Sequence, residues 1–261
     1  MLIAAACGGT DDTEPGAVGA SDAPSTGAEP STAAPAAETA SADASSIPTT
    51  ASPSTTEEPP TTMPTTSTTT EPPEPVFFAA ARETSEDELG ASWRPGCPVP
   101  VEDLRWLDLA HWDMNGRVVD GVLVLHRDHV DAVVSVFERL FEAGFRIESM
   151  RPITEFDADD NVSMRANNSS AFNCRLIDGT DRWSQHAYGG AIDINPLINP
   201  WVRGDQVDPP EGAPYLDRDA DVPGLIRSGD VVTEAFAAIG WGWGGDWSSS
   251  LDYQHFSHNG R

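Results

Sequence analysis

Two short segments of this sequence contain the side chains that could do chemistry. His186 and Asp193 lie in the first segment, and Asp252 and His255 lie in the second, about 60 residues later. Two imidazoles and one carboxylate make a catalytic zinc set when the fourth coordination position is left to water. A further carboxylate nearby can take the proton from that water. Any one of these histidines alone would be interpreted as an ordinary core or surface residue, but the combined pattern indicates metal-assisted hydrolysis.

The local sequence of the first segment predicts how its two side chains meet. Residues 191–194 are typical of a short strand. In such a strand Asp193 alternates with two isoleucines, so its side chain points to the face opposite the apolar face that they occupy. A charged group in the middle of such a strand is costly unless it is paired or bound to metal. Gly189 and Gly190 let the chain turn closely enough for His186 and Asp193 to converge.

The two segments together carry a paired motif, Ser184-x-His186-x-x-Gly189-x-Ala191-x-Asp193-Ile194 followed by Asp252-x-x-His255-Phe256. This pair resembles the zinc D-alanyl-D-alanine carboxypeptidase family, which includes the vancomycin-resistance D,D-carboxypeptidases and phage L-alanyl-D-glutamate endopeptidases. The resemblance covers most of residues 93–258, including the stretches 167–175 and 195–200. It implies a zinc ion held by His186, Asp193 and His255. It also implies that Asp252 is the general base, at a position where many relatives have glutamate.

The resemblance implies a peptidase acting on the stem peptides of peptidoglycan, foremost as a D-alanyl-D-alanine carboxypeptidase. An L-alanyl-D-glutamate-type endopeptidase and a non-catalytic cell-wall-binding domain of the same fold are the alternatives. Because a binding module has no need of a general base, Asp252 favours the enzyme. Peptidoglycan stem peptides are therefore the expected partner, and we expect the chain to act as a monomer.

Candidate substrate-binding residues lie near the motif. A substrate carboxylate and a developing oxyanion both need a cation or a hydrogen-bond donor nearby. Arg175 is the first candidate because it lies in the stretch that carries the resemblance, and Arg151, directly after an expected strand, is the second. For each arginine a structural ion pair is the equal alternative. Ser184 and Gln185 are candidates for orienting His186 or for contacting substrate.

The elements that must position these residues predict a single compact α+β domain over 92–261, with a small antiparallel sheet flanked by helices. The expected strands cover 121–126, 145–150, 191–194 and 253–257, and the expected helices cover 128–143 and 231–239. Ser228 or Asp230 is expected to open the second helix. Asp252 is expected on the loop before the last strand. Residues 151–185 show no period and are expected to form a long functional loop region.

A segment of very different composition precedes the domain. Residues 8–91 are expected to form a disordered linker rich in Ser, Thr, Pro and Ala, with a possible short helix near 79–90. Residues 1–7 resemble the end of a bacterial lipoprotein signal that stops at Cys7. Two acyl chains on Cys7 would anchor the chain, so we expect an extracytoplasmic, membrane-anchored lipoprotein of the cell envelope. An accidental match followed by a low-complexity tail is the alternative.

The charge distribution excludes two classes of binding protein. The formal net charge is −27, and all 15 cations are arginines from Arg82 onward. Such a chain does not bind nucleic acid by neutralising phosphates, and it has no basic surface for anionic lipid headgroups. No other stretch is long and apolar enough to span a bilayer, so membrane contact is expected only through Cys7.

Cys97 and Cys174 are the remaining cysteines. In an extracytoplasmic protein such a pair is most simply one disulfide, and closing a loop of about 77 residues could contribute on the order of 4 kcal/mol. Two buried free thiols are the alternative in a cytoplasmic protein.

Three further patterns are weaker. The stretches that begin at Asp157 and Asp217 start like calcium loops but lack the glycine at the sixth position. The tryptophan-rich run 241–247 could wall a peptide cleft or pack in the core.

Overall fold

The computed structural model of the protein describes residues 75–261, so Cys7 and the predicted linker up to residue 74 lie outside the described residues. The helices are α1 (Glu86–Leu89), α2 (Val130–Glu142), α3 (Asp160–Arg165) and α4 (Val231–Ala238). The strands are β1 (Ala79–Glu83), β2 (Leu104–Trp112), β3 (Val118–His126), β4 (Ser149–Met150), β5 (Asn168–Ser169), β6 (Ala191–Asp193), β7 (Trp201–Arg203), β8 (Gln206–Asp208), β9 (Gly242–Trp243), β10 (Leu251–Asp252) and β11 (His255–Ser257).

The strands form three antiparallel sheets of three strands each and one parallel pair, β4 with β5, within the described residues. The strand orders are β1-β2-β3, β10-β7-β8 and β6-β11-β9. Together with the helices they confirm the predicted α+β class with small antiparallel sheets. The strands are divided among several sheets, however, whereas the sequence led us to expect one.

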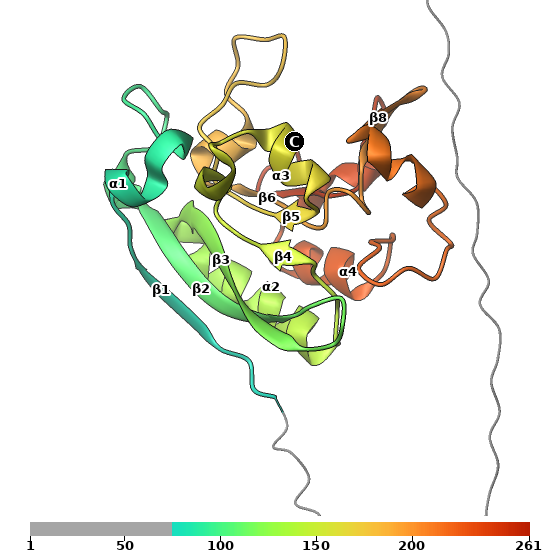
Figure 1. Ribbon diagram of the computed structural model, residues 1–261. Coiled ribbons are helices and arrows are strands. Elements are labelled where there is room, and N and C mark those ends of the chain that lie inside the picture. Colours follow the sequence, from blue (N-terminus) through green and yellow to red (C-terminus); the bar gives the residue numbers. More distant parts are fainter. Residues whose placement is uncertain (1–74) are drawn as a thin grey trace, which may run out of the picture. The chain divides into compact units, whose positions relative to one another are not determined.

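The β2–β3 hairpin is the largest β structure, and its turn is built around Asp113. The Oδ1 atom of this side chain accepts hydrogen bonds of 2.9 Å from the backbone N–H groups of Asn115 and Arg117. Helix α2 packs against β2, as Figure 1 shows. This helix begins after a 3-10 turn at Arg127–His129, in agreement with the predicted helix over 128–143.

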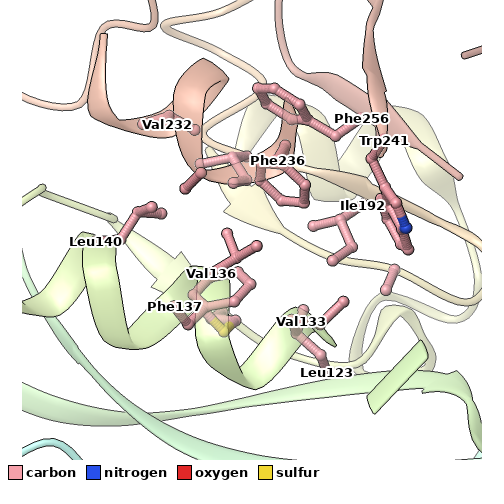
Figure 2. Close-up of a cluster of buried hydrophobic side chains, with 14 of the residues drawn as sticks. Leu123, Val133, Val136, Phe137, Leu140, Ile192, Val232, Phe236, Trp241 and Phe256 are labelled. Atoms are coloured by element: carbon pink, nitrogen blue, oxygen red, sulfur yellow. The ribbon is translucent and has the colours of Figure 1, made fainter. Parts of the chain in front are cut away.

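The larger of the two hydrophobic core clusters contains side chains of α2 and α4, together with side chains of β2 and β3. The side chains of these helices that meet in Figure 2 are Val133, Val136, Phe137, Leu140, Val232 and Phe236. Ile192 of β6 and Phe256 of β11 enter the same cluster, and the ring centroids of Phe236 and Phe256 lie 4.1 Å apart. The β6–β11 pair is therefore anchored on the core by one of its faces.

The folded region extends beyond the predicted boundary at Ser92. Residues 79–83, predicted as linker or helix, form β1, which pairs with β2 from Ala79 opposite Leu109 to Glu83 opposite Arg105. Without β1 the edge of β2 would expose a row of unpaired backbone groups, and this distant partner leaves no trace in the local composition. The helix is limited to α1, where Ser85 and Glu88 form a capping box.

Other elements differ from their predicted extent. Only β4 remains of the strand predicted over 145–150, and β2 was not predicted. The region 151–185, predicted as a loop, contains α3 and β5. Asp230 caps α4 by accepting hydrogen bonds from two backbone N–H groups of its first turn, so it is the helix opener of the two candidates.

A disulfide joins Cys97 to Cys174, which are 77 residues apart in the sequence and 5.9 Å apart at their Cα atoms. The backbone N–H of Cys174 also donates to the carbonyl oxygen of Ser92, at 3.0 Å. The entry segment of the domain is thus tied to its middle. None of the helices within residues 75–261 combines the length and the apolar character needed to cross a membrane.

Candidate metal centre

Strands β6 and β11 place Asp193 and His255 opposite each other. In this antiparallel pair Asp193 is the partner of His255, and Ile192 is the partner of Phe256. Because side chains alternate along a strand, the first pair shares one face of the sheet and the second pair shares the other. Ile192 and Phe256 are fully buried in the core. Their packing therefore sets the face on which the carboxylate and the imidazole meet.

His186 reaches the same place from a 3-10 turn, η5 (Gln185–Tyr188). Ser184 caps this turn, and its Oγ accepts a hydrogen bond from the His186 N–H at 3.3 Å. Gly189 ends the turn with a φ of 63°, where a Cβ would lie 2.5 Å from the backbone nitrogen of His126. Only glycine satisfies both conditions, so the turn brings His186 beside β6 as the sequence predicts.

Three ligand atoms converge on one buried point. His186 Nε2 lies 3.1 Å from Asp193 Oδ2 and 3.3 Å from His255 Nδ1. His255 Nδ1 lies 3.0 Å from Asp193 Oδ1. All three residues are buried, and they are the one group of three such side chains in the described part of the chain whose ligand atoms are close enough to hold a metal ion.

In each imidazole ring, the outer nitrogen, which points away from the other two ligands, is hydrogen-bonded to a main-chain oxygen. This bond determines whether the nitrogen that points toward the ligands carries a lone pair. His186 Nδ1 lies 2.5 Å from the carbonyl oxygen of Ala171, and His255 Nε2 lies 3.1 Å from the main-chain oxygen of Arg261. A carbonyl or carboxylate oxygen only accepts hydrogen bonds, so His186 Nδ1 and His255 Nε2 each carry a proton. In the neutral rings, the lone pairs of His186 Nε2 and His255 Nδ1 then face each other and the carboxylate of Asp193.

Three electron-pair donors at this separation require a positive charge between them. A divalent cation that prefers nitrogen and oxygen ligands, such as zinc, meets that requirement, so the residues fit the metal that the resemblance implies. In the metal-free protein a proton supplies the charge. Burial alone would lower the pKa of His255, but the hydrogen bond to Asp193 and the charge of Asp193 raise the pKa of His255 to about 9.

The carboxylate of Asp193 is the negatively charged partner of His255 in this ion pair. Burial alone would raise its pKa, but the charge of His186 and the hydrogen bonds from His186 and His255 hold the pKa of Asp193 well below its usual range. A metal ion must therefore displace a proton from His255, whereas Asp193 is already ionised at neutral pH.

Asp252 lies beside this group on β10, where it is the partner of Trp201 of β7. The prediction that it lies on a loop is wrong, because its strand pairs with a segment about 50 residues earlier, which the local sequence does not reveal. Burial raises the pKa of Asp252 to about 7. The charges of His255 and His186 lower this pKa, and the charge of Asp193 raises it, but burial has the largest effect. Such a carboxyl group suits a general base that also acts as an acid.

The Oδ1 atom of Asp252 is buried and has no hydrogen-bond partner, so it is an acceptor left free at the site. Gly244 keeps the space that this residue occupies. A Cβ at position 244 would lie 2.7 Å from the Asp252 Cβ and 2.6 Å from the Asp252 main-chain oxygen. The side chain of Gln254, which sequence reasoning did not single out, lowers the pKa of Asp252.

Both candidate arginines take part in ion pairs. Arg175 pairs with Asp160 at 2.6 Å, and its Nε is buried without a partner. Arg151 pairs with Glu155 at 2.9 Å and is largely exposed. Among the described residues, neither guanidinium forms a hydrogen bond or ion pair with the three side chains of the candidate metal centre.

Ser184 and Gln185 shape the turn that carries His186. Ser184 acts through its cap on this turn, whereas Gln185 acts through its main-chain oxygen, which accepts the N–H of Gly189. In the tryptophan-rich run 241–247, two tryptophans pack in the core and one lies beside the candidate metal centre. Trp241 and Trp243 belong to the core, whereas the Trp247 ring lies 5.4 Å from the ring of His255.

The two stretches that resemble calcium loops serve local turns. Asp159 caps α3 by accepting from the backbone of Val162 at 3.0 Å, and Asp217 accepts from the backbone of Asp219 at 3.1 Å. Sequence reasoning missed the oxygens of Ala171 and Arg261, because a main-chain acceptor is independent of residue type.

Residues 178–258 match a family model described as D-alanyl-D-alanine carboxypeptidase. The matched segment contains His186, Asp193, Asp252 and His255, so the resemblance is confirmed there, and the match supports a peptidase at the level of the family. Residues 93–177 lie outside the match. Comparisons with curated proteins and with solved structures give no significant match.

Proposed function

We propose, from the match of residues 178–258 to the D-alanyl-D-alanine carboxypeptidase family, that this chain is a zinc-dependent peptidase that removes the terminal D-alanine from peptidoglycan stem peptides. The observation that carries the proposal is the convergence of His186, Asp193 and His255, with Asp252 beside them. A domain that only bound cell-wall peptides would have no use for a carboxyl group with a buried, unpartnered acceptor oxygen at that place.

The roles follow from the arrangement of the side chains. His186, Asp193 and His255 would hold the zinc ion, which when bound polarises the scissile carbonyl and makes water more acidic. Asp252 takes a proton from the attacking water and returns it to the leaving amine. Its pKa of about 7 in the metal-free protein lies close to the value at which both transfers are efficient, and a neighbouring dication favours the ionised, basic form.

Arg175 is the residue that we propose to meet the substrate carboxylate. Its main-chain oxygen accepts the N–H of Ser184 at 3.1 Å, and the N–H of Asn173 donates to the His186 oxygen at 3.2 Å. The segment that carries Arg175 therefore runs beside the turn that carries His186. The Nε of Arg175 is buried and has no hydrogen-bond partner, and its Nη2 pairs with Asp160. Arg151 is the second choice.

We also propose that the chain acts as a monomer in the cell envelope, attached to the membrane through a lipid on Cys7. The disulfide between Cys97 and Cys174 supports an oxidising compartment. Fractionation tests the anchor: the Cys7→Ser variant should leave the membrane fraction, and an unchanged distribution would contradict lipid attachment.

Cleavage of a defined peptide tests the function. The zinc-loaded full chain is incubated with a synthetic pentapeptide stem ending in D-Ala-D-Ala, and the products are identified by mass spectrometry. We expect loss of one D-alanine. An internal cut after L-alanine would instead indicate the endopeptidase reaction. If the protein is folded and zinc-loaded but the peptide stays intact, the peptidase proposal is wrong and a non-catalytic binding domain is favoured. The same peptide ending in L-Ala-L-Ala is the matched control and should remain uncut.

A further inference from the structure

The outer nitrogen of His255 is bound by a turn formed by residues 257–261. His255 Nε2 lies 3.1 Å from the main-chain oxygen of Arg261. Ser257 closes this turn twice, because its Oγ donates to the Arg261 oxygen at 2.8 Å and accepts from the Arg261 N–H at 2.9 Å. The Arg261 oxygen therefore accepts from both a buried hydroxyl and the imidazole, and its position is determined from two sides.

A second set of contacts holds the same turn against the metal centre. Trp247 Nε1 donates to the Gly260 oxygen at 2.9 Å, while the Trp247 ring lies 5.4 Å from the ring of His255. Gly242 packs against Gly260, since a Cβ at position 242 would lie 2.6 Å from the Gly260 Cα. The turn is thus packed in place beside the ring that it binds.

We infer that residues 257–261 form a clamp that positions His255 as a metal ligand. When the ring is neutral, as a metal ligand must be, the Arg261 oxygen keeps the proton on Nε2, so the Nδ1 lone pair is directed at Asp193 and His186. It also fixes the rotation of the ring about the Cβ–Cγ bond. Oxygen acceptors behind a metal-binding imidazole commonly change metal affinity by 10- to 100-fold, as an order of magnitude. This inference rests on the proposed metal site.

The clamp differs from its counterpart at His186. The Ala171 oxygen that binds His186 Nδ1 lies in a buried stretch three residues from the disulfide at Cys174. Arg261, by contrast, is exposed and holds the clamp only through its main chain. Loss of this single residue should therefore release His255 while the core that carries β11 stays intact.

The test measures zinc affinity of the full chain by competition with a chromophoric chelator. Deletion of Arg261 and the Ser257→Ala variant should each weaken zinc binding by about 10- to 100-fold. Arg261→Ala is the matched control, because it removes the side chain and retains the main-chain oxygen; its affinity should equal that of the wild type. Absorption spectra of the cobalt-loaded proteins give a second readout, and their visible bands should shift in the first two variants only.

The outcomes separate this inference from the proposed function. Equal zinc affinity in all four proteins would overturn the clamp, and so would an Arg261→Ala variant that binds as weakly as the deletion. If the deletion does not fold, as judged by circular dichroism, Ser257→Ala decides. A wild-type protein that binds zinc through the clamp but cleaves no stem peptide would remove the peptidase function and leave the clamp intact. A wild-type protein that binds no zinc would overturn both.

Discussion

Asp193 and His255 are direct partners across β6 and β11, with 3.0 Å between Asp193 Oδ1 and His255 Nδ1. The spacing of these two ligands is set by a strand pairing whose other face, Ile192 and Phe256, is buried in the core. A site built on strands holds its side chains more rigidly than one built on loops. The candidate metal centre is therefore preorganised by the fold, and its members should have separable roles.

Turnover should be lost without loss of metal in one variant, and together with the metal in another. His186→Ala removes one of three ligands, so the purified protein should contain little zinc. Asp252→Asn keeps all three ligands and should retain zinc, while its turnover falls by roughly 10²- to 10⁴-fold because the proton acceptor is gone. Zinc content by elemental analysis and cleavage of the stem peptide check both statements. His129→Ala, a histidine outside the centre, is the control and should change neither; full turnover in Asp252→Asn would place the base elsewhere.

Gly244→Ala should displace the general base without removing the metal. The added Cβ would lie 2.7 Å from the Asp252 Cβ, so one of the two must move. A misplacement of about 1 Å can cost on the order of 10²-fold in rate, and we expect a loss of that size in kcat with zinc content unchanged. Ser249→Ala, an exposed position in the same loop, should behave as the wild type. Normal kcat in Gly244→Ala would show that Asp252 tolerates displacement or does not act.

Zinc affinity should depend on pH through His255. The hydrogen bond and charge of Asp193 raise the pKa of His255 to about 9 in the metal-free protein, despite the opposing effect of burial. Below that pH a zinc ion must displace one proton from His255, so the apparent zinc affinity should increase about tenfold per pH unit from about pH 7 to 8 and level off above about pH 9. Below about pH 7 the affinity should rise more steeply, because Asp252 also releases a proton there. Asp193, with its lowered pKa, adds no dependence in this range. Chelator competition at constant ionic strength measures the slope, and a flat profile would contradict the ion pair.

Removal of the disulfide should destabilise the domain. The bond closes a loop of 77 residues, for which the entropy of the unfolded chain predicts a contribution on the order of 4 kcal/mol. Urea unfolding of the Cys97→Ser/Cys174→Ser double variant should therefore show a lower midpoint than the wild type under non-reducing conditions. The wild type under reducing conditions should resemble the variant. Coincident curves for variant and oxidised wild type would contradict this role.

The convergence of His186 and Asp193 followed from local sequence patterns, whereas His255 was assigned to the same site by the family resemblance. Asp193 alternates with isoleucines, and Gly189 permits the left-handed turn after His186, so short stretches were sufficient to predict that these side chains meet. The cap of α4 was narrowed to Ser228 or Asp230 for the same reason, and the structure selects Asp230.

Features that depend on distant partners were not predictable. β1 is a strand only because the edge of β2 lies beside it, and Asp252 lies on a strand only because β7 returns to pair with it. β2 itself lacks strict alternation, since Leu107, Leu109 and Ala110 are all buried. The ion pair of Arg151 with Glu155, four residues away, was within reach of local reasoning, but that of Arg175 depends on where the fold places Asp160.

We propose that His186, Asp193 and His255 bind the zinc ion on which peptide hydrolysis depends. Release of D-alanine from the pentapeptide stem, measured before zinc removal, after dialysis against a chelator and after zinc is restored, tests it most directly. We expect release by the native protein, none after dialysis, recovery on adding zinc, and no recovery for the His186→Ala variant. Unchanged release by the zinc-free protein, or full recovery of His186→Ala, would contradict it.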